Sequence, residues 1–470
     1  MTNNLTPPKI SLAGMAKLAG PIFIANIAII GGGTIDTVMA GQLGKDHLAA
    51  IALGLAATLC VTLALTGILM SLSPITGHHF GAREYPKIGE DLQQNLWLGV
   101  FLSLIGVPLL MDTGLWTKLG GVSGDVAHMA SQYLIFSAIG LPGALFARTF
   151  ISTNSALSRP KIPMFISIGT LLLKAPVNAV FMYGWFGLPA MGGAGAGAAY
   201  CVLTYLSLLV LVVIWRKDSF YKDFHSDRIW APRWSLLREQ LRIGIPIGLS
   251  TFFEVSSFTL MAIFVSRFGS EVISAHQIVS NITSMCYQVP LSLGIATSVL
   301  VSQSLGARWP SVAYEALKRS LKLVTSVALV IVLALFFTRG FIMSLYTSDA
   351  GVIKLGTSVL IFGCIYHVFD AMQCVSSFAL RGYRVTRAPM IIYGVMLWAV
   401  GLGGGYIFGF GAEWAGGPYG IFGFWGATTV GLILTGIALS TMAIVVGRRN
   451  LRRETHTPEE VAAAIREATH

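Results

Sequence analysis

The sequence predicts an all-α integral membrane protein with twelve transmembrane helices, arranged as two six-helix bundles. Hydrophobic residues make up 54% of the 470 residues and charged residues only 11%, which is far from the composition of a soluble domain. Apolar runs of about 20 residues, the length that crosses a bilayer as a helix, follow one another along the chain. The second half also repeats short motifs of the first half.

Twelve apolar runs, separated by Lys, Arg or Pro/Gly clusters, define the predicted spans. Each is about twice as long as the ten-residue alternating segments of a transmembrane β-barrel. Their richness in Gly, Ala and Leu is typical of helices packed in lipid. We expect helices over residues 12–38, 48–79, 93–111, 128–150, 162–184, 192–215, 240–266, 272–305, 318–338, 352–380, 388–410 and 420–446.

The internal repeat sets the domain organisation. Pro21, Gly44 and Gly81-Ala82-Arg83 recur 225 positions later, and Leu134-Ile135-Phe136 and Pro163-Met164 recur 226 positions later. Because this offset covers six helices, an even number, the two halves should have the same orientation in the membrane. We expect an N-terminal lobe over 1–215, a cytoplasmic linker over 216–239, a C-terminal lobe over 240–446 and a cytoplasmic tail over 447–470.

The net charge of +11 reports orientation and does not indicate nucleic-acid binding. The N-terminus, the even-numbered connections and the tail carry 26 of the 32 Lys and Arg residues, whereas the odd-numbered connections carry five. By the positive-inside rule both termini are cytoplasmic, and the protein is expected in a bacterial-type inner (plasma) membrane. The five cysteines lie in apolar runs without the spacing of a metal site. We expect no cofactor and no nucleic acid, and a monomer in contact with membrane lipid.

Three acidic residues, Asp36, Glu254 and Asp370, lie inside predicted spans. A charge at the bilayer centre costs about 2.5–3.5 kcal/mol, so intramembrane acids are functional candidates. Glu254 lies about 14 residues, roughly 21 Å, into its span, and Asp370 lies a similar distance into its own span, which is entered from the opposite side. Both are therefore near the midplane. Tyr366 precedes Asp370 by four residues and shares its helix face. These groups could hold a sodium ion or share a proton; alternatively, the acids only hydrogen-bond helix to helix.

The N-terminal half contains a buried cation beside its acid. Lys174 and Asn178 lie one turn apart on the fifth span, and Asp36 lies in the outer half of the first. One hypothesis is that Lys174 neutralises Asp36 and that a cationic substrate or coupling ion must displace this contact. The alternative is that Lys174 extends toward the membrane interface.

These features together resemble the multidrug and toxin extrusion family, in its NorM branch. The resemblance covers residues 10–448 and includes the segment Ile35-Asp36-Thr37-Val38-Met39-Ala40-Gly41, the run Pro176-Val177-Asn178-Ala179, and the acids of both halves. It implies two bundles around a central V-shaped cleft. It also implies antiport, in which sodium or protons enter while bulky, often cationic, organic compounds are exported.

The resemblance also implies roles for particular residues. Glu254, Tyr366 and Asp370 are similar to the cation-binding cluster of the C-terminal lobe, where Na⁺ would be held if it is the coupling ion. Asp36 and Asn178 are similar to the polar or substrate site of the N-terminal lobe. The chain departs from the family at Lys174, where an uncharged polar residue is usual.

Two other functions remain open from the sequence. A flippase for a lipid-linked precursor has a related architecture, but it should line its cleft with several Arg and Lys residues. A membrane-embedded enzyme should carry clustered Asp motifs or a His-Glu-x-x-His helix, and neither motif occurs in this sequence.

Overall fold

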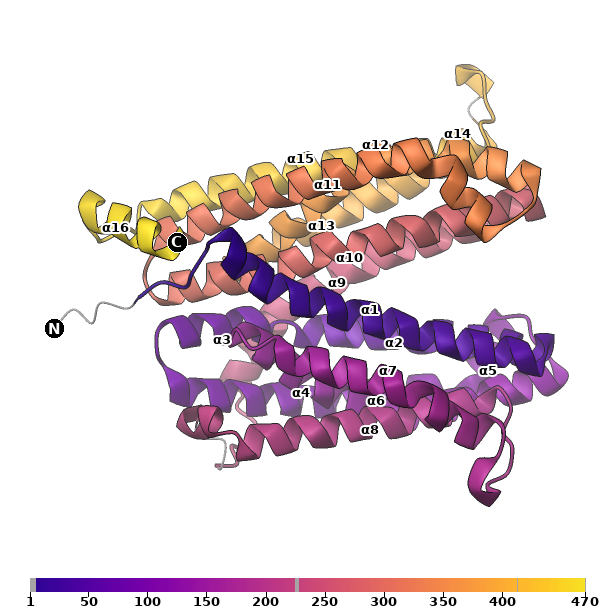
Figure 1. Cartoon of the computed structure of the whole chain (residues 1–470), viewed down its shortest axis with the longest axis horizontal. Coiled ribbons are helices and arrows are strands. Elements are labelled where there is room, and N and C mark those ends of the chain that lie inside the picture. Colours follow the sequence, from indigo (N-terminus) through magenta and orange to yellow (C-terminus); the bar gives the residue numbers. More distant parts are fainter. Residues whose placement is uncertain (1–5, 225–227, 412, 470) are drawn as a thin grey trace. The chain divides into compact units, whose positions relative to one another are not determined.

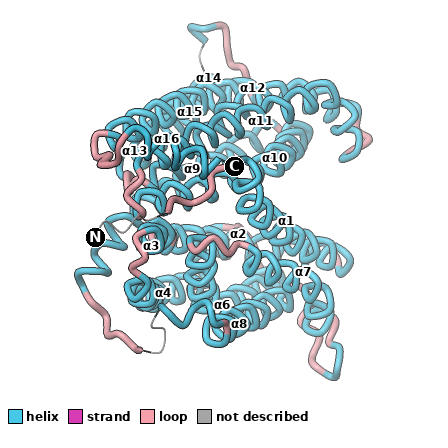
Figure 2. The backbone as a smooth tube through the Cα atoms, turned by 60° about the vertical axis from the view of Figure 1, so that its left-hand side comes forward, coloured by secondary structure: helices cyan, strands magenta, loops and turns pink. Residues whose placement is uncertain are grey.

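The computed structural model describes residues 6–224, 228–411 and 413–469, and every regular element within these ranges is a helix (Figures 1 and 2). In this described part of the chain, 12 helices are long and apolar enough to cross a membrane. The predicted fold class and the predicted number of spans are therefore confirmed.

All predicted spans are present as helices, and most extend beyond the predicted limits. The first six spans are α1 (Leu12–Leu43), α2 (Lys45–Leu69) with α3 (Leu72–Gly81), α4 (Tyr85–Met111), α6 (Gly124–Ala156), α7 (Lys161–Met182) and α8 (Ala194–Lys217). The second six are α9 (Trp234–Val265), α10 (Ser270–Gly306), α11 (Pro310–Tyr346), α12 (Ala350–Gly382), the run α13, η4 and α14 (Arg387–Tyr393, Gly394–Gly403, Gly404–Phe410) and α15 (Ile421–Leu451). The short helices are α5 (Thr113–Leu119), η1 (Trp185–Gly187), η2 (Ser219–Phe224), η3 (Ser266–Phe268), η5 (Glu413–Ala415) and α16 (Pro458–Thr469).

Helix α11 shows why the helices exceed the apolar runs. It begins at Pro310, eight residues before the predicted start of the span. Its first turns carry Glu315, whose carboxylate forms ion pairs with Lys318 and Arg319 at 2.6 and 3.0 Å. Such pairs three and four residues apart stabilise a helix outside the hydrocarbon. Hydropathy therefore locates the membrane-embedded part of a helix and not its ends.

The internal repeat is reproduced in the backbone. Arg83, after α3, has φ 57°, and Arg308, 225 positions later and after α10, has φ 65°. Ser158, after α6, and Arg384, 226 positions later and after α12, both have φ 60°. Left-handed geometry costs a non-glycine residue about 1–2 kcal/mol. Its recurrence at both predicted offsets confirms that the two halves are structural repeats.

The chain divides into two compact units. One contains Gly20–Gly248, and the other contains the residues before Gly20 together with those from Leu249 onward. We refer to them as the N-unit and the C-unit. The N-unit includes the linker after α8, while the C-unit includes the tail after α15.

The tail packs on the C-unit. Ala464 and Ala468 of α16 join a buried apolar cluster with Ile10 and Trp309, and the Ile10 amide donates to the Ala468 carbonyl at 2.7 Å. The helix begins with a capping box, in which Thr457 and Glu460 exchange hydrogen bonds. The sequence, with Pro458 next to Thr457, predicts this cap, and the structure confirms it.

Candidate functional site

The N-unit holds a buried polar centre formed by α1 and α7. The Lys174 ammonium lies 3.0 Å from Asp36 Oδ2, and the Asn178 amide donates to Asp36 Oδ1 at 2.7 Å. The exposed fractions are 4% for Asp36, 7% for Lys174 and 0% for Asn178. Of the two hypotheses for Lys174, the structure supports the pair with Asp36 and not the extension toward the interface.

This N-unit centre is neutral and almost fully bonded. Each carboxylate oxygen of Asp36 has one partner, and the charge of Lys174 cancels that of Asp36. Within the described chain, the one polar atom of this centre that lacks a partner is Asn178 Oδ1, a buried acceptor. An unpaired buried acceptor is costly, so this oxygen is the position where a donor from a ligand or a water would bind.

The C-unit holds a second polar centre, formed by α9, α10, α12 and α13, in which Asp370 and Gln373 are buried and Glu254 is half-buried. Glu254 lies on α9, and Asp370 and Gln373 lie one turn apart on α12. The Gln373 amide nitrogen donates to Asp370 Oδ1 at 3.0 Å and lies 3.3 Å from Glu254 Oε1. A single amide group therefore joins the two carboxylates that the sequence predicts to act together.

Two tyrosines extend this network. The Tyr287 hydroxyl, from α10, donates to Glu254 Oε1 at 2.9 Å. The Tyr393 hydroxyl donates to the carbonyl oxygen of Gln373. Tyr393 is the last residue of α13, directly before the π-helical stretch η4, a type of segment that is often associated with functional sites.

The structure places the third predicted ligand, Tyr366, in a different environment. It is 2% exposed and stacks on Trp425 at 6.1 Å between ring centroids, and its hydroxyl is paired with Thr283. In the part of the chain that the structure describes, Tyr366 makes no hydrogen bond to Glu254 or Asp370. Its role as a cation ligand stays a prediction, which would require this hydroxyl to change partners.

The C-unit centre differs from the N-unit centre in charge. Among the described residues, no basic side chain forms an ion pair with Glu254 or Asp370. Arg381, 8% exposed, attracts Glu254 only through its longer-range field. The guanidinium instead lies over the Phe378 ring, 4.0 Å from its centroid. Two acids without a paired cation form a site that can accept one.

Sequence reasoning identified the acids but not all of their partners. Gln373 was recognisable, because it follows Asp370 by three residues and shares its helix face. Tyr287 was recognisable only as an aromatic residue. No sequence signal indicated Tyr393, which reaches the network from a helix 20 positions further along the chain.

Comparison with known proteins gives the same architecture. The MatE family model matches the chain twice, over residues 21–180 and 246–407, so the second match begins 225 positions after the first, as in the repeat. A crystal structure of the eukaryotic MATE transporter AtDTX14 is similar with a TM-score of 0.81 at 21% identity, covering 97% of this chain and 98% of that chain. The outward-facing conformation of a multidrug resistance MATE family transporter of the MOP superfamily is similar with a TM-score of 0.83 at 17% identity, covering 97% and 100%.

Relatives found by sequence have a higher identity to this chain than these two structures. The probable multidrug resistance protein NorM of Aromatoleum aromaticum is 35% identical over 95% of this chain and 97% of its own length. The multidrug resistance protein PmpM of Pseudomonas aeruginosa is 31% identical over 96% and 95%.

The fold and the two centres define a twelve-span membrane protein built from two repeats, each with a buried polar centre. The family matches and the relatives make the assignment specific: the chain belongs to the MatE family.

Proposed function

We propose that this protein is a cation-coupled multidrug efflux antiporter, in which sodium or protons drive the export of bulky, often cationic, organic compounds. The names of its relatives support multidrug export. The observation that carries the coupling mechanism is the pair of carboxylates, Glu254 and Asp370, joined through one amide nitrogen of Gln373.

The C-unit centre acts as the cation site. Two carboxylates close together in a low-dielectric interior cannot both stay charged without a compensating positive charge. A proton shared between them or a sodium ion bound by their oxygens supplies this charge, and oxygen ligands suit a hard cation. Release of the cation leaves a net negative centre that favours a different conformation or a cationic substrate. If the bound cation weakens substrate binding, thermodynamic linkage requires that the bound substrate weaken cation binding by the same factor.

The N-unit centre serves as the polar substrate site. Its Lys174–Asp36 pair has no net charge, so it does not attract an inorganic cation. A cationic substrate that displaced Lys174 would gain the Asp36 carboxylate, while Asn178 offers an unpaired acceptor. Exchange of ion-pair partners at Asp36 would keep the buried carboxylate neutralised throughout.

The topology belongs to the same proposal. Both termini and the 216–239 linker face the cytoplasm of a bacterial inner membrane, because the basic residues concentrate on that side. The lobes predicted over 1–215 and 240–446, which the compact units divide at Gly20 and Gly248 instead, act as the two moving bodies of one monomer surrounded by lipid, with 447–470 as a cytoplasmic tail.

Transport measured in inverted membrane vesicles tests the proposal. Sodium and proton gradients are imposed separately, and efflux of ethidium is followed by fluorescence. We expect Glu254→Gln and Asp370→Asn each to abolish gradient-driven efflux, because each removes one of the two charges that bind the cation.

The matched control is Glu271→Gln, which removes an exposed carboxylate at the start of α10 in the same unit. It should leave efflux unchanged. Full activity in either centre variant, with protein that remains inserted and monodisperse, would refute the assignment of the cation site. The gradient that drives the wild type identifies the coupling ion.

A further inference from the structure

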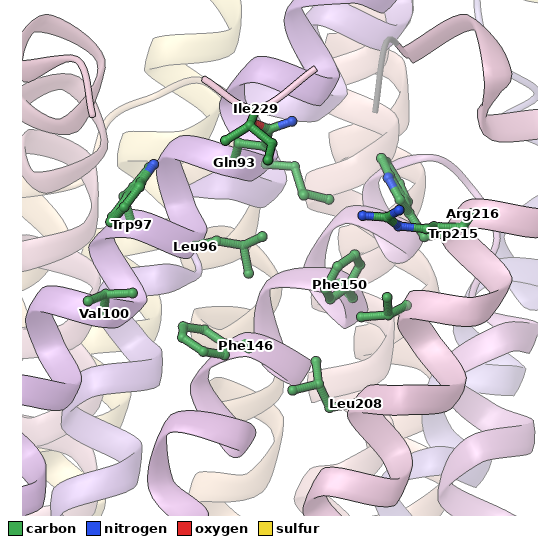
Figure 3. A pocket seen from close by; sticks show the side chains of 12 residues that line it. Gln93, Leu96, Trp97, Val100, Phe146, Phe150, Leu208, Trp215, Arg216 and Ile229 are labelled. Atoms are coloured by element: carbon green, nitrogen blue, oxygen red, sulfur yellow. The ribbon is translucent and has the colours of Figure 1, made fainter. Parts of the chain in front are cut away.

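A cavity lies in the N-unit and shares no lining residue with either polar centre. It has a volume of about 410 Å³ and lies between α4, α6 and α8 under the linker (Figure 3). Cavities that hold small ligands are usually about 300–1,000 Å³, so it is large enough for one. Its lining residues are Leu92, Gln93, Leu96, Trp97, Val100, Phe146, Phe150, Leu208, Val212, Trp215, Arg216 and Ile229.

The lining is apolar along its length and polar at one end. Leu96, Phe146 and Leu208, one from each helix, form its apolar walls (Figure 3). Among the described residues of the lining, Arg216 is the only charged one, and Gln93 is the only other one with a strongly polar side chain. An occupant that fits must therefore be largely hydrocarbon with an anionic group at one end.

The linker residues beside the cavity are attached to α4 by hydrogen bonds. Trp97 donates from its indole nitrogen to the Trp230 carbonyl at 2.9 Å, and the Trp230 amide donates to Gln93 Oε1 at 2.6 Å. Gln94 adds a hydrogen bond to the Ala231 carbonyl at 2.8 Å. This backbone holds Ile229 at the cavity although its side chain is 87% exposed. A large apolar side chain fixed in such an exposed position suits contact with hydrocarbon.

The surface beside the cavity is also apolar. Leu206, Leu209 and Val213 of α8 are 40%, 59% and 41% exposed. The exposed face of α8 is therefore a lipid-facing surface, and hydrocarbon chains can approach the cavity along it.

Arg216 is available for an anion. It is exposed, and Figure 3 shows its side chain directed from α8 toward the cavity. Among the described residues it has no ion-pair partner. Two acidic residues near the linker already form ion pairs with other basic residues. Asp218 pairs with Arg159 at 2.7 Å, and Glu90 pairs with Arg233.

We infer that this cavity binds one anionic phospholipid of the membrane leaflet on the linker side, with an acyl chain between α4, α6 and α8 and the headgroup phosphate at Arg216. Guanidinium groups bind phosphate through charge-assisted hydrogen bonds. Binding requires both the acyl chain and the negative charge of the lipid, whereas a soluble phosphate offers only the charge. The identity of the leaflet rests on the proposed membrane orientation, but the binding site itself does not.

Native mass spectrometry of the full-length protein tests the inference. The protein, delipidated in detergent, is titrated with phosphatidylglycerol or with phosphatidylcholine of the same acyl chains. We expect wild type to retain one phosphatidylglycerol in preference to phosphatidylcholine. Arg216→Gln should weaken phosphatidylglycerol binding about five-fold, which is the usual contribution of one basic residue at a membrane surface. Val212→Trp, which fills the cavity, should reduce retention of both lipids.

The matched control is Lys217→Gln, because Lys217 is the adjacent exposed cation of α8 and does not line the cavity. It should bind as wild type does. Equal losses in Arg216→Gln and Lys217→Gln would mean non-specific surface attraction and overturn the inference, as would unchanged binding in Val212→Trp. Competition by soluble glycerol phosphate at the concentration of the lipid would show that only the phosphate is recognised. These outcomes do not depend on ethidium efflux, so they are separate from the test of the proposed function.

Discussion

The polar centres of the two units differ in how they compensate the charge of a carboxylate within a span. Both bury a carboxylate in a span, but the N-unit places Lys174 3.0 Å from Asp36, whereas the C-unit joins Glu254 and Asp370 through the neutral Gln373. The first centre carries its own counter-charge, and the second requires one from outside. One structural repeat thus holds a closed ion pair and the other an acidic site without an ion-pair partner among the described residues. Under the proposed function, the second is the site of the coupling cation.

The largest expected difference between the two centres is in how far a substitution lowers the free energy of unfolding. Lys174→Met should lower the free energy of unfolding by about 3–5 kcal/mol, because it leaves Asp36 buried and charged without its partner. The double variant Asp36→Asn with Lys174→Met should recover most of this loss. Titration with SDS in mixed micelles measures the free energies. By contrast, Glu254→Gln should cause no loss of this size, since Glu254 has no such partner; additive losses in the N-unit variants would show that Lys174 and Asp36 do not interact.

The shared amide of the C-unit gives a second test. Gln373→Leu removes the donor common to Glu254 and Asp370, and hydrogen bonds to charged groups contribute about 1.5–3 kcal/mol. We expect ethidium efflux to fall at least ten-fold, with a change in the apparent affinity for the coupling ion. Tyr287→Phe removes a donor to Glu254 alone and should have a smaller effect. Equal effects would mean that Gln373 does not link the two acids.

The units also differ in the segment that follows the sixth span of each. The C-unit tail depends on the capping box at the start of α16, in which the Thr457 amide and hydroxyl, both bonded to Glu460, lower the pKa of that carboxyl. Thr457→Ala should cost about 1 kcal/mol of local helix stability. Amide hydrogen exchange should increase over residues 459–469 and remain unchanged over the N-unit linker. Unchanged exchange in α16 would show that packing against Ile10 and Trp309 alone holds the tail.

The N-unit linker should show the smallest effect, and one that depends on pH. The backbone amide of Phe220, and then Arg159, lower the pKa of Asp218. Because the pKa is lower in the folded state, this contribution is present above the unfolded value, about 3.9, and disappears as the pH falls through the folded value. For a partly exposed pair we expect about 0.5 kcal/mol, absent in Asp218→Asn. A variant whose unfolding free energy differs equally from wild type at pH 7 and below pH 4 would contradict this.

The sequence by itself determined the number of spans, the repeat and the acids inside the membrane. Hydropathy records which segments prefer hydrocarbon, and a carboxylate within such a segment is visible without any structure. The capping box before α16 was also readable, because its residues are neighbours in the chain. Helix ends were less certain, as at Pro310, because a helix continues after hydropathy falls.

Only the tertiary structure decided which polar groups meet. The pairing of Lys174 with Asp36, the position of Gln373 between two acids, the arrival of Tyr393 and the separate packing of Tyr366 all join residues from different helices. Local sequence patterns fix the face of a helix on which a side chain lies. They do not fix which helix faces it, because helix packing in lipid depends on the fit of complete surfaces.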